Sequence, residues 1–314
     1  MTEFIMLVGL PASGKSTYAE ELKQEGYHIH SSDAIREELT GDENAQDKNT
    51  EVFSILHSRI KDDLKSGISC VYDATNMSMK RRVAFLKELK KINCIKECVL
   101  FLIPIEECKK RNAQRKRKVP DEVIDKMVGQ FDVPMEYEGW DEISIETDKT
   151  ISYDYPIGDT IGFDQENSHH SLTLYDHMKK SSTYIENNYI RTTNPLHHYD
   201  IMRYSRIARA AYNHDIGKLI TKTFINSKGE VTKDAHYYGH DRAGAYLYLL
   251  GRVCDDYLYL ENDDWYIASL INWHMRPYIG WKQSERAKER DKRLIGEKMY
   301  EDIMILHEAD LVAH

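Results

Sequence analysis

The sequence predicts an α/β domain, in which helices cover both faces of a parallel sheet, followed by a second, all-α domain. In the first half, short apolar runs alternate with helix-forming stretches, which is typical of parallel sheets. In the second half, strand signals nearly vanish and helical periodicity dominates. The length of 314 residues exceeds the usual single-domain size of roughly 100 to 200 residues. We therefore assign residues 1–147 to the first domain, 148–167 to a linker and 168–314 to the second domain.

Each expected element follows from its local pattern. An apolar run over residues 3–9 predicts a strand, and residues 16–25 predict the helix that follows a glycine-rich turn. The other elements of the first domain are strands at 27–32, 68–72, 95–103 and 142–146 and helices at 50–65, 78–91 and 106–115. Periodicity fades among prolines and glycines after residue 147, which places the linker there. The clearest helices of the second domain are expected at 199–213, 239–260 and 297–311.

The composition excludes several classes of protein. The longest apolar run, residues 98–103, is far too short for a membrane span, and the first residues do not resemble a cleavable leader, so we expect a cytoplasmic protein. Five cysteines without a CxxC pair argue against a disulfide framework or a zinc ribbon. Because the net charge is −9, any contact with nucleic acid must be local. One candidate is the run 109–118, in which seven of ten residues are cationic.

A phosphate-binding loop is predicted at residues 9–16, where GLPASGKS matches GxxxxGK[ST] between a strand and a helix. Backbone N–H groups of such a loop attract phosphate oxygens, while Lys15 reaches the β and γ phosphates and the Ser16 hydroxyl binds Mg²⁺. A surface turn that matches by chance is the alternative, and the flanking strand and helix argue against it. We expect ATP or another NTP, with Mg²⁺, bound by Gly9, Pro11, Ala12, Ser13, Gly14, Lys15, Ser16 and Thr17.

The residues that handle the phosphate acceptor are expected at the carboxyl ends of the next two strands. Asp33, with Arg36 nearby, could take the proton of an acceptor hydroxyl, and an equally open alternative is that it only caps the following helix. Asp73 could orient Mg²⁺ or the acceptor, or it could simply form a turn. Arg111 and Arg115 lie four residues apart, so a helix would present both on one face as a lid that clamps a triphosphate. A solvated face is the alternative, but the rest of the domain is acidic, which favours a function.

Together these motifs resemble the phage-type polynucleotide 5′-kinases over residues 1–139. GLPASGKST, SSDAIR, DATN followed by arginines, and KRNAQRKRKVP occur in the same order and spacing. The resemblance implies that Asp33 and Arg36 handle a 5′-hydroxyl end and that Arg115 contacts the phosphates, with Lys15 as the remaining catalytic residue. The family often has glycine where Ala12 stands, which should be tolerated if that residue has a negative φ. Related small-molecule kinases share these motifs, so the acceptor class stays open.

The second half contains histidines and aspartates spread over more than a hundred residues, in stretches expected to be helical. Helical spacing places His214 and Asp215, within NHDIGK, on the buried face of the helix over 199–213. Burying these groups without partners is costly, and a shared divalent metal would offset that cost. A lone histidine is more often a packing residue, so the prediction depends on the whole set. Such ligands suit Mn²⁺, Fe, Co²⁺, Ni²⁺ or Zn²⁺, and Lys218 could hold the phosphate or its leaving group.

This set resembles the HD phosphohydrolases over residues 170–314. The resemblance implies that His177, His214, Asp215 and Asp310 ligate one metal, and that His240 and His274 serve a second metal or the phosphate. Among the other histidines, His236 has the best claim to approach the phosphate, ahead of His169, His170, His197 and His198.

A 5′-kinase joined to a phosphohydrolase resembles the bifunctional end-healing proteins, although in those proteins the HD module comes first. Cleaved RNA carries a 5′-hydroxyl and a 2′,3′-cyclic phosphate, and neither end can be ligated. We therefore expect RNA or DNA ends as substrates, phosphorylation of the 5′ end, hydrolysis of a cyclic phosphate or a 2′- or 3′-phosphate, and a separate ligase acting downstream. Two alternatives stay open: a small-molecule or nucleoside kinase with an HD nucleotidase, and a non-catalytic HD module that senses nucleotides or oligomerises.

Overall fold

The computed structural model describes residues 1–42, 45, 47–168, 171–254 and 262–314. The chain divides into two compact units. Unit one comprises Met1–Ile124 and Pro134–Asp148, and unit two comprises Asp125–Val133 and Lys149–His314. The sequence predicts that residues 125–133 belong to the first domain and that 148–167 form a linker. The structure instead groups Asp125–Val133 and residues 149–167 with the second unit.

Segment Asp125–Val133 joins unit two through partners that are distant in the sequence. Phe131 packs edge-on against Tyr246, with ring centroids 5.2 Å apart. Arg242 Nε donates to Asp132 Oδ1 at 2.9 Å, and the Asn272 amide donates to the Phe131 carbonyl at 3.1 Å. Because these partners lie more than a hundred residues away along the chain, no local pattern could show where this segment belongs.

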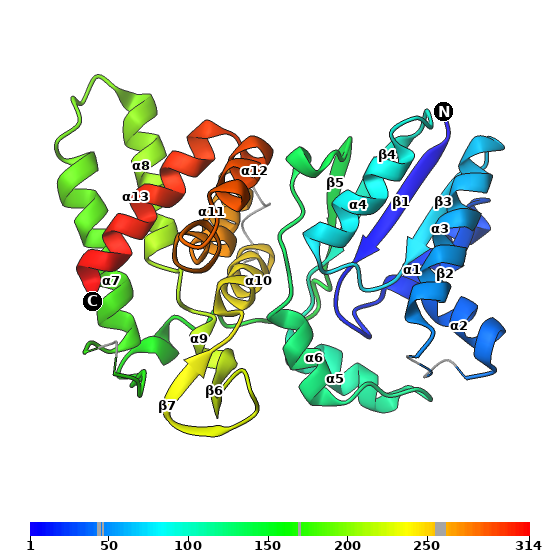
Figure 1. The fold of residues 1–314 in the computed structure, drawn as a ribbon, viewed down its shortest axis with the longest axis horizontal. Helices are drawn as coiled ribbons and strands as arrows, with labels where there is room; N and C mark the ends of the chain where they lie inside the picture. Colours follow the sequence, from blue (N-terminus) through cyan, green and yellow to red (C-terminus); the bar gives the residue numbers. More distant parts are fainter. Residues whose placement is uncertain (43–44, 46, 169–170, 255–261) are drawn as a thin grey trace. The chain divides into compact units, whose positions relative to one another are not determined.

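Unit one is built on a five-stranded parallel sheet in the order β2-β3-β1-β4-β5, with helices packed on it (Figure 1). The strands are β1 (Glu3–Val8), β2 (His28–Ser31), β3 (Cys70–Asp73), β4 (Ile95–Phe101) and β5 (Glu142–Glu146). The helices are α1 (Lys15–Gln24), α2 (Ser32–Thr40), α3 (Asn49–Lys65), α4 (Met79–Leu89) and α5 (Ile105–Gln114), with a short 3₁₀ turn at Glu136–Glu138. Helix α6 (Asp121–Val128) begins in unit one and ends in unit two. The predicted parallel α/β architecture is confirmed.

The central position of β1 determines where a site can form. Its side chains from Phe4 to Val8 are almost fully buried, as expected for a strand covered on both faces. The neighbours of β1 are β3 on one side and β4 on the other, so the chain leaves β1 in one direction and later returns on the opposite side. Ligands in open α/β sheets bind at the carboxyl edge near such a change of direction. The loop at residues 9–14 lies at this edge.

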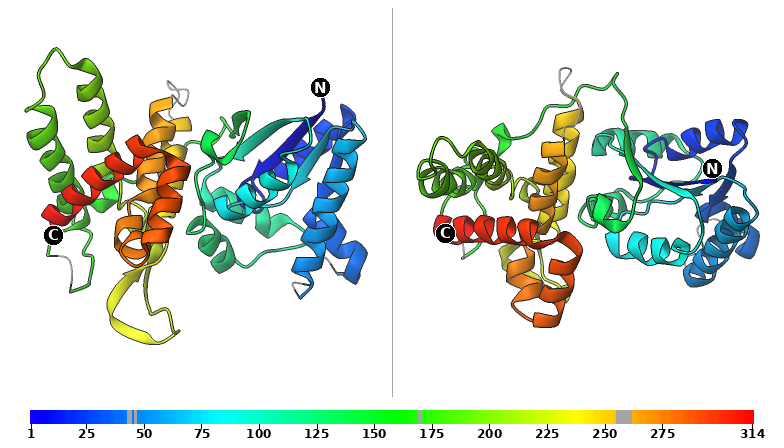
Figure 2. Two further views of the ribbon diagram at one scale, coloured as in Figure 1. Left: turned by 45° about the horizontal axis from the view of Figure 1, so that its top comes forward. Right: turned by 90° about the horizontal axis from the view of Figure 1, so that it is seen from above.

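Unit two is mainly helical but contains a β-hairpin (Figures 1 and 2). Its helices are α7 (Leu174–Ile185), α8 (His198–Ala211), α9 (Lys218–Thr221), α10 (His240–Val253), α11 (Asn262–Trp273), α12 (Glu285–Ile295) and α13 (Glu297–Ala313), with a 3₁₀ turn at Gly158–Thr160 and π-helical turns at Glu186–Ile190 and Pro277–Trp281. The antiparallel strands β6 (Lys222–Ile225) and β7 (Val231–Tyr237) correct the prediction of an all-α domain. They were hard to predict because β6 has only four residues and both strands are rich in polar residues.

Two sequence predictions fall partly outside the described residues. The helix predicted over 239–260 is present as α10 up to Val253, and residues 255–260 are not described. His169 and His170 also lie outside the described residues. Among the residues that the structure does describe, no helix has both the length and the apolar character needed to cross a bilayer.

Candidate nucleotide and metal sites

The loop between β1 and α1 has the form of a phosphate cradle. Gly9 must lack a side chain, because a Cβ there would lie 2.8 Å from the Phe101 Cβ and 2.9 Å from the Ser13 Oγ. Gly14 has a φ of 105° and is the N-cap of α1, so the N-terminus of this helix faces the loop. Helix N-termini attract phosphate oxygens. The expected nucleotide-binding residues of this loop and of the first turn of α1 are therefore contiguous at the carboxyl edge of β1.

Lys15 is folded back over this loop. Its Nζ donates to the Gly9 carbonyl at 3.0 Å, the Leu10 carbonyl at 2.5 Å and the Ser13 hydroxyl at 3.2 Å. The side chain is buried, and this burial lowers the pKa of Lys15 to about 8. A phosphate group would restore a charged partner to the ammonium, so the position suits an anionic ligand.

Asp73 lies beside the loop, as its place at the end of β3 predicts. It accepts a hydrogen bond from the Ser16 hydroxyl at 3.1 Å, and burial raises its pKa despite the nearby Lys15. A carboxylate bonded to this hydroxyl can orient Mg²⁺ or its water ligands. Residues just after Asp73 fix the loop through two hydrogen bonds. Gly9 N–H donates to the Thr75 carbonyl at 3.0 Å, and the Asn76 amide donates to the Leu7 carbonyl at 2.9 Å.

Ala12 does not have the negative φ that would let an alanine replace the glycine of the family without strain. Its φ is 60°, in the left-handed region that disfavours side chains. The chain accepts this conformation because the loop on either side is fixed by Gly9, Lys15 and Ser13. The left-handed φ of Ala12 implies backbone strain at the centre of the cradle.

Asp33 stands in the first turn of α2 and is held by two arginines. The N-cap of this helix is Ser31, whose hydroxyl accepts from the Ala34 N–H, so Asp33 is not the capping residue that the alternative proposed. Arg36 Nη1 donates to Asp33 Oδ1 at 2.6 Å, and Arg117 Nη1 pairs with the other carboxylate oxygen. Burial alone would raise the pKa of Asp33, but Arg117 and Arg36 outweigh it and lower the pKa. The two arginines therefore hold Asp33 in its ionised form.

The lid arginines differ from the geometry that their spacing predicts. Helix α5 ends at Gln114, and Arg115 already has an extended backbone, so Arg111 and Arg115 do not share one helix face. Arg111 pairs with Glu107 at 2.9 Å and with Asp148 at 2.5 Å. The helix stops here because the Asn112 side chain bonds both the N–H and the carbonyl of Val119, which turns the following loop back.

Arg117 is the residue of this loop that reaches a predicted catalytic group, and no role was predicted for it. The sequence signal that could have found it is the basic run itself, since its cations continue past the end of the helix. Its guanidinium side chain is only 15% exposed where it meets Asp33.

In unit two, four histidines and two aspartates converge from five segments of the chain. His177 lies on α7, His240 begins α10, and Asp310 lies on α13. His214 and Asp215 lie in a turn after α8, and His274 follows α11, which corrects the prediction that all six are helical. Helix α8 ends at Ala211, and i→i−3 hydrogen bonds then tighten the chain through residue 218.

The two halves of this cluster meet at Asp215. On one side, His177 Nε2 lies 3.2 Å from His214 Nε2 and 3.0 Å from Asp310 Oδ1. Asp215 Oδ2 faces this side, 3.3 Å from His177 Nε2. On the other side, Asp215 Oδ1 lies 3.1 Å from His240 Nε2 and 3.7 Å from His274 Nε2. One carboxylate thus offers one oxygen to each half.

The tautomers of three imidazoles are fixed by the backbone. The Nδ1 atoms of His214, His240 and His274 each lie 2.7 Å from a carbonyl three residues earlier, those of Ala211, Tyr237 and Ile271. A carbonyl can only accept, so Nδ1 carries the proton and Nε2 presents its lone pair to the cluster. Lone pairs and carboxylates that face one another need a shared cation or proton. This donor set fits a divalent transition metal.

Hydrogen bonds and ion pairs within the cluster shift the pKa values of its members. Burial alone would lower the pKa of His177, but hydrogen bonds to Asp215 and Asp310 raise it to about 9. Burial alone would raise the pKa of Asp215, but Lys218 and His214 hold it well below its usual range. Lys218 Nζ lies 2.7 Å from Asp215 Oδ2 and donates to Gln165 Oε1 at 2.7 Å. Neither Gln165 nor Tyr278, whose hydroxyl donates to Asp310 Oδ2 at 2.8 Å, carries a local sequence signal.

Gly217 explains why the turn can approach α10 so closely. A Cβ at this position would lie 2.0 Å from the His240 carbonyl oxygen and 2.5 Å from the Gly244 nitrogen. The glycine of HDIGK therefore allows Asp215 to lie next to His240. His236, by contrast, lies on β7, where its Nε2 is 2.9 Å from the Thr232 hydroxyl.

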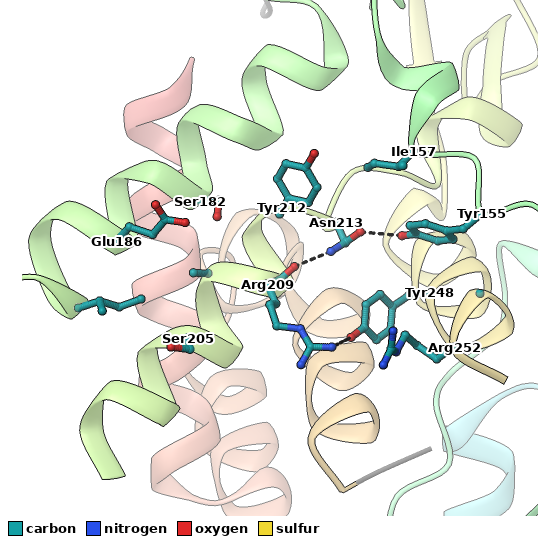
Figure 3. Close-up of a pocket in the computed structure, with 13 residues that line it drawn as sticks. Tyr155, Ile157, Ser182, Glu186, Ser205, Arg209, Tyr212, Asn213, Tyr248 and Arg252 are labelled. Carbon is teal, nitrogen blue, oxygen red and sulfur yellow. Dashed lines mark hydrogen bonds between the residues drawn. The ribbon is translucent and has the colours of Figure 1, made fainter. Parts of the chain in front are cut away.

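A separate cavity of about 630 Å³ lies in unit two, between α7, α8, α10 and residues 155–157 (Figure 3). None of the six clustered histidines and aspartates lines it. Its wall includes Asn213, which accepts from the Tyr155 hydroxyl at 2.7 Å and donates to the Arg209 carbonyl at 2.7 Å. Since Asn213 directly precedes His214, these bonds help to fix the turn that carries two of the candidate ligands.

Comparison with known proteins bears on the first part of the chain. Residues 4–134 match the family described as AAA domain. The chain is 29% identical over 162 residues to the L-seryl-tRNA(Sec) kinase of Methanococcus maripaludis, covering 48% of this chain and 61% of that protein. The chain thus spans less than two thirds of this curated relative. Together with the sheet, these findings support a parallel-sheet P-loop domain of the kinase type.

Solved structures with a similar arrangement include the Pnkp1/Rnl/Hen1 RNA repair complex, at 23% identity and a TM-score of 0.36 over 41% of this chain and 43% of that chain. A gluconokinase from Sinorhizobium meliloti 1021 is 15% identical, with a TM-score of 0.34 over 46% of this chain and 82% of that chain.

Proposed function

We propose that the chain heals nucleic-acid ends, with a 5′-hydroxyl kinase site in unit one and a metal-dependent phosphohydrolase site in unit two. The observation that carries the proposal is the convergence of His177, His214, Asp215 and Asp310. The same chain also holds a phosphate cradle, with the Asp33 carboxylate as the candidate proton acceptor. A kinase and a phosphohydrolase together make both ends of a cleaved RNA ligatable. A separate ligase would then act on the product.

In the kinase site, the residues of the cradle hold ATP and position its γ phosphate. Backbone N–H groups and Lys15 bind the phosphates, and Ser16 with Asp73 holds Mg²⁺. Asp33 accepts the proton of the 5′-hydroxyl as that oxygen attacks the γ phosphorus and ADP leaves. Arg36 and Arg117 keep Asp33 ionised until the acceptor arrives, and Arg115 supplies charge to the phosphates.

In the hydrolase site, His177, His214, Asp215 and Asp310 would hold one divalent ion, and His240 and His274 a second that shares Asp215. A transition metal bound there supplies Lewis acidity, which lowers the pKa of water and polarises a phosphate oxygen. Lys218 is buried beside Asp215 and neutralises charge that accumulates on the phosphate. Gln165 holds the Lys218 ammonium in place.

One experiment tests both sites. An RNA with a 5′-hydroxyl and a 2′,3′-cyclic phosphate is incubated with ATP and Mg²⁺, with Mn²⁺ or Ni²⁺ added, and both ends are followed by chromatography and mass spectrometry. Lys15→Ala should lose 5′ phosphorylation and keep hydrolysis, whereas Asp215→Ala should do the reverse. Each variant is thus the folding control for the other. Wild-type protein that leaves the cyclic phosphate intact with every metal would refute the hydrolase proposal.

A second candidate acceptor follows from the relative that phosphorylates L-seryl-tRNA(Sec). Unit one would then act on a hydroxyl other than an RNA 5′ end, in keeping with a small-molecule or nucleoside kinase. Offering 5′-hydroxyl RNA, a mononucleoside and seryl-tRNA in parallel separates these candidates. Phosphorylation of a nucleoside or of seryl-tRNA, with no product from the 5′-hydroxyl RNA, would replace the end-healing proposal with this one.

A further inference from the structure

The hairpin β6–β7 leaves the metal-ligand cluster and returns to it. It begins four residues after Lys218 and ends three residues before His240. At its base, His240 Nδ1 donates to the Tyr237 carbonyl at 2.7 Å, and the Tyr237 hydroxyl donates to the Gln165 carbonyl at 2.6 Å. Because both ends are attached to residues of the cluster, the hairpin is a fixed extension of the candidate hydrolase site.

The two faces of the hairpin differ. Lys222 and Tyr237 are opposite each other in the register and face inward, where Lys222 Nζ donates to the Asp164 carbonyl at 2.9 Å and to Glu166 Oε1 at 2.7 Å. Thr223 and His236 are also opposite each other, so they occupy the other face. On that outer face the rings of His236 and Tyr238 are stacked, with centroids 5.5 Å apart and 13° between their planes. The Tyr238 side chain is 51% exposed.

The hairpin, residues 222–237, carries three lysines against one glutamate and one aspartate. One of the lysines, Lys222, is already paired with Glu166. Lys228 and Lys233 are exposed. An exposed tyrosine stacked on a partly buried histidine, with lysines nearby, can bind single-stranded nucleic acid, since bases stack on the rings and phosphates pair with the lysines.

We propose that the outer face of this hairpin binds the nucleotides that precede the terminal phosphate of the hydrolase substrate. The base next to the end stacks on Tyr238 and His236, and Lys228, in the turn between the two strands, contacts a phosphate further along the strand. The inference rests on the proposed hydrolysis, and it assigns that activity to the ends of strands in preference to free nucleotides.

The test compares two substrates that carry the same reactive group. Hydrolysis of a 2′,3′-cyclic mononucleotide and of an oligoribonucleotide with a 2′,3′-cyclic end is measured for wild type, Tyr238→Ala and Lys228→Ala. Tyr238→Ala should lower kcat/KM for the oligonucleotide about 5- to 150-fold, the effect of losing ~1–3 kcal/mol of stacking, mainly through KM. The mononucleotide rate should change less than about twofold. The lysine variant should flatten the salt dependence of oligonucleotide hydrolysis.

A matched control is Tyr199→Ala, because Tyr199 is another exposed aromatic of unit two, on α8. It should leave both substrates unaffected. Equal losses on both substrates in Tyr238→Ala would assign this residue to the cluster itself, and no loss on either would leave the face to a protein partner; both results overturn the inference.

Binding of a fluorescent single-stranded RNA, followed by anisotropy, tests the hairpin even if wild type hydrolyses neither substrate. Absence of hydrolysis would sink the proposed function. Absence of any difference in RNA affinity between wild type and Tyr238→Ala would sink the inference.

Discussion

Replacing Ala12 by glycine should stabilise unit one, although it shortens a side chain in the phosphate cradle. Ala12 has a φ of 60°, and the left-handed region costs a residue with a Cβ about 1–2 kcal/mol. Glycine avoids this strain but loses more conformational freedom on folding, which costs about 0.5–1 kcal/mol. The difference leaves Ala12→Gly more stable by up to about 1.5 kcal/mol. For a unit of this size that corresponds to an increase of up to roughly 5 °C in Tm.

Calorimetry can measure this shift, since the transition of unit one is the one that moves when ATP and Mg²⁺ are added. The control is Ala84→Gly, because Ala84 is exposed in the middle of α4 and glycine in a helix interior costs about 1 kcal/mol. The two substitutions remove the same methyl group and should move Tm in opposite directions. A fall in Tm for Ala12→Gly similar to that of Ala84→Gly would refute the argument from strain.

The other predictions concern buried charge, close packing and protonation. Arg82→Met should destabilise unit one by about 3–5 kcal/mol in urea unfolding, because it leaves Glu138 buried without the guanidinium that bonds it at 2.7 and 2.8 Å. Adding Glu138→Gln should recover part of the lost stability. A smaller loss for the single variant than for the double variant would contradict this. Gly217→Ala should weaken Mn²⁺ binding in calorimetric titration while ATP binding stays unchanged, since its Cβ would meet the His240 carbonyl; wild-type Mn²⁺ affinity would contradict the packing. ATP affinity should fall as pH rises through about 8, where the buried Lys15 ammonium loses its proton, and this dependence should be absent in Lys15→Arg; equal pH profiles would contradict it.

The sequence predicts most of unit one because its signals are local. The strands β1, β3 and β4 are largely apolar runs, and the cradle is a contiguous motif. The lid could not be predicted in the same way. A spacing of four places Arg111 and Arg115 on one face only if the helix continues, and whether it does depends on Asn112, which bonds Val119 seven residues later. The positive φ of Ala12 likewise depends on contacts made by the rest of the loop.

In unit two, the sequence indicates which residues converge but not what surrounds them. Helical spacing gives the right burial for His214 and Asp215, although both lie beyond the end of α8. Gln165 stands in the segment expected to be a linker, and nothing near it in the sequence suggests that it bonds Lys218. The hairpin was missed because short polar strands are stabilised by the segment they pack on, here Asp164 and Glu166, and not by their own pattern.

The two candidate sites differ in how much they must change to bind their ligands. The Lys15 ammonium already donates three hydrogen bonds to the loop. A phosphate group therefore has to displace the contacts to the Gly9 and Leu10 carbonyls before it can accept a hydrogen bond from Lys15. Three imidazoles of the cluster, those of His214, His240 and His274, are already oriented by bonds from Nδ1 to backbone carbonyls, and their Nε2 atoms need no rotation to meet a metal. The entropy cost of ordering the ligand-binding groups is therefore incurred during folding in unit two and during ligand binding in unit one. It follows that ATP binding should change the conformation of its loop, whereas metal binding should mainly add stability to side chains that are already in place.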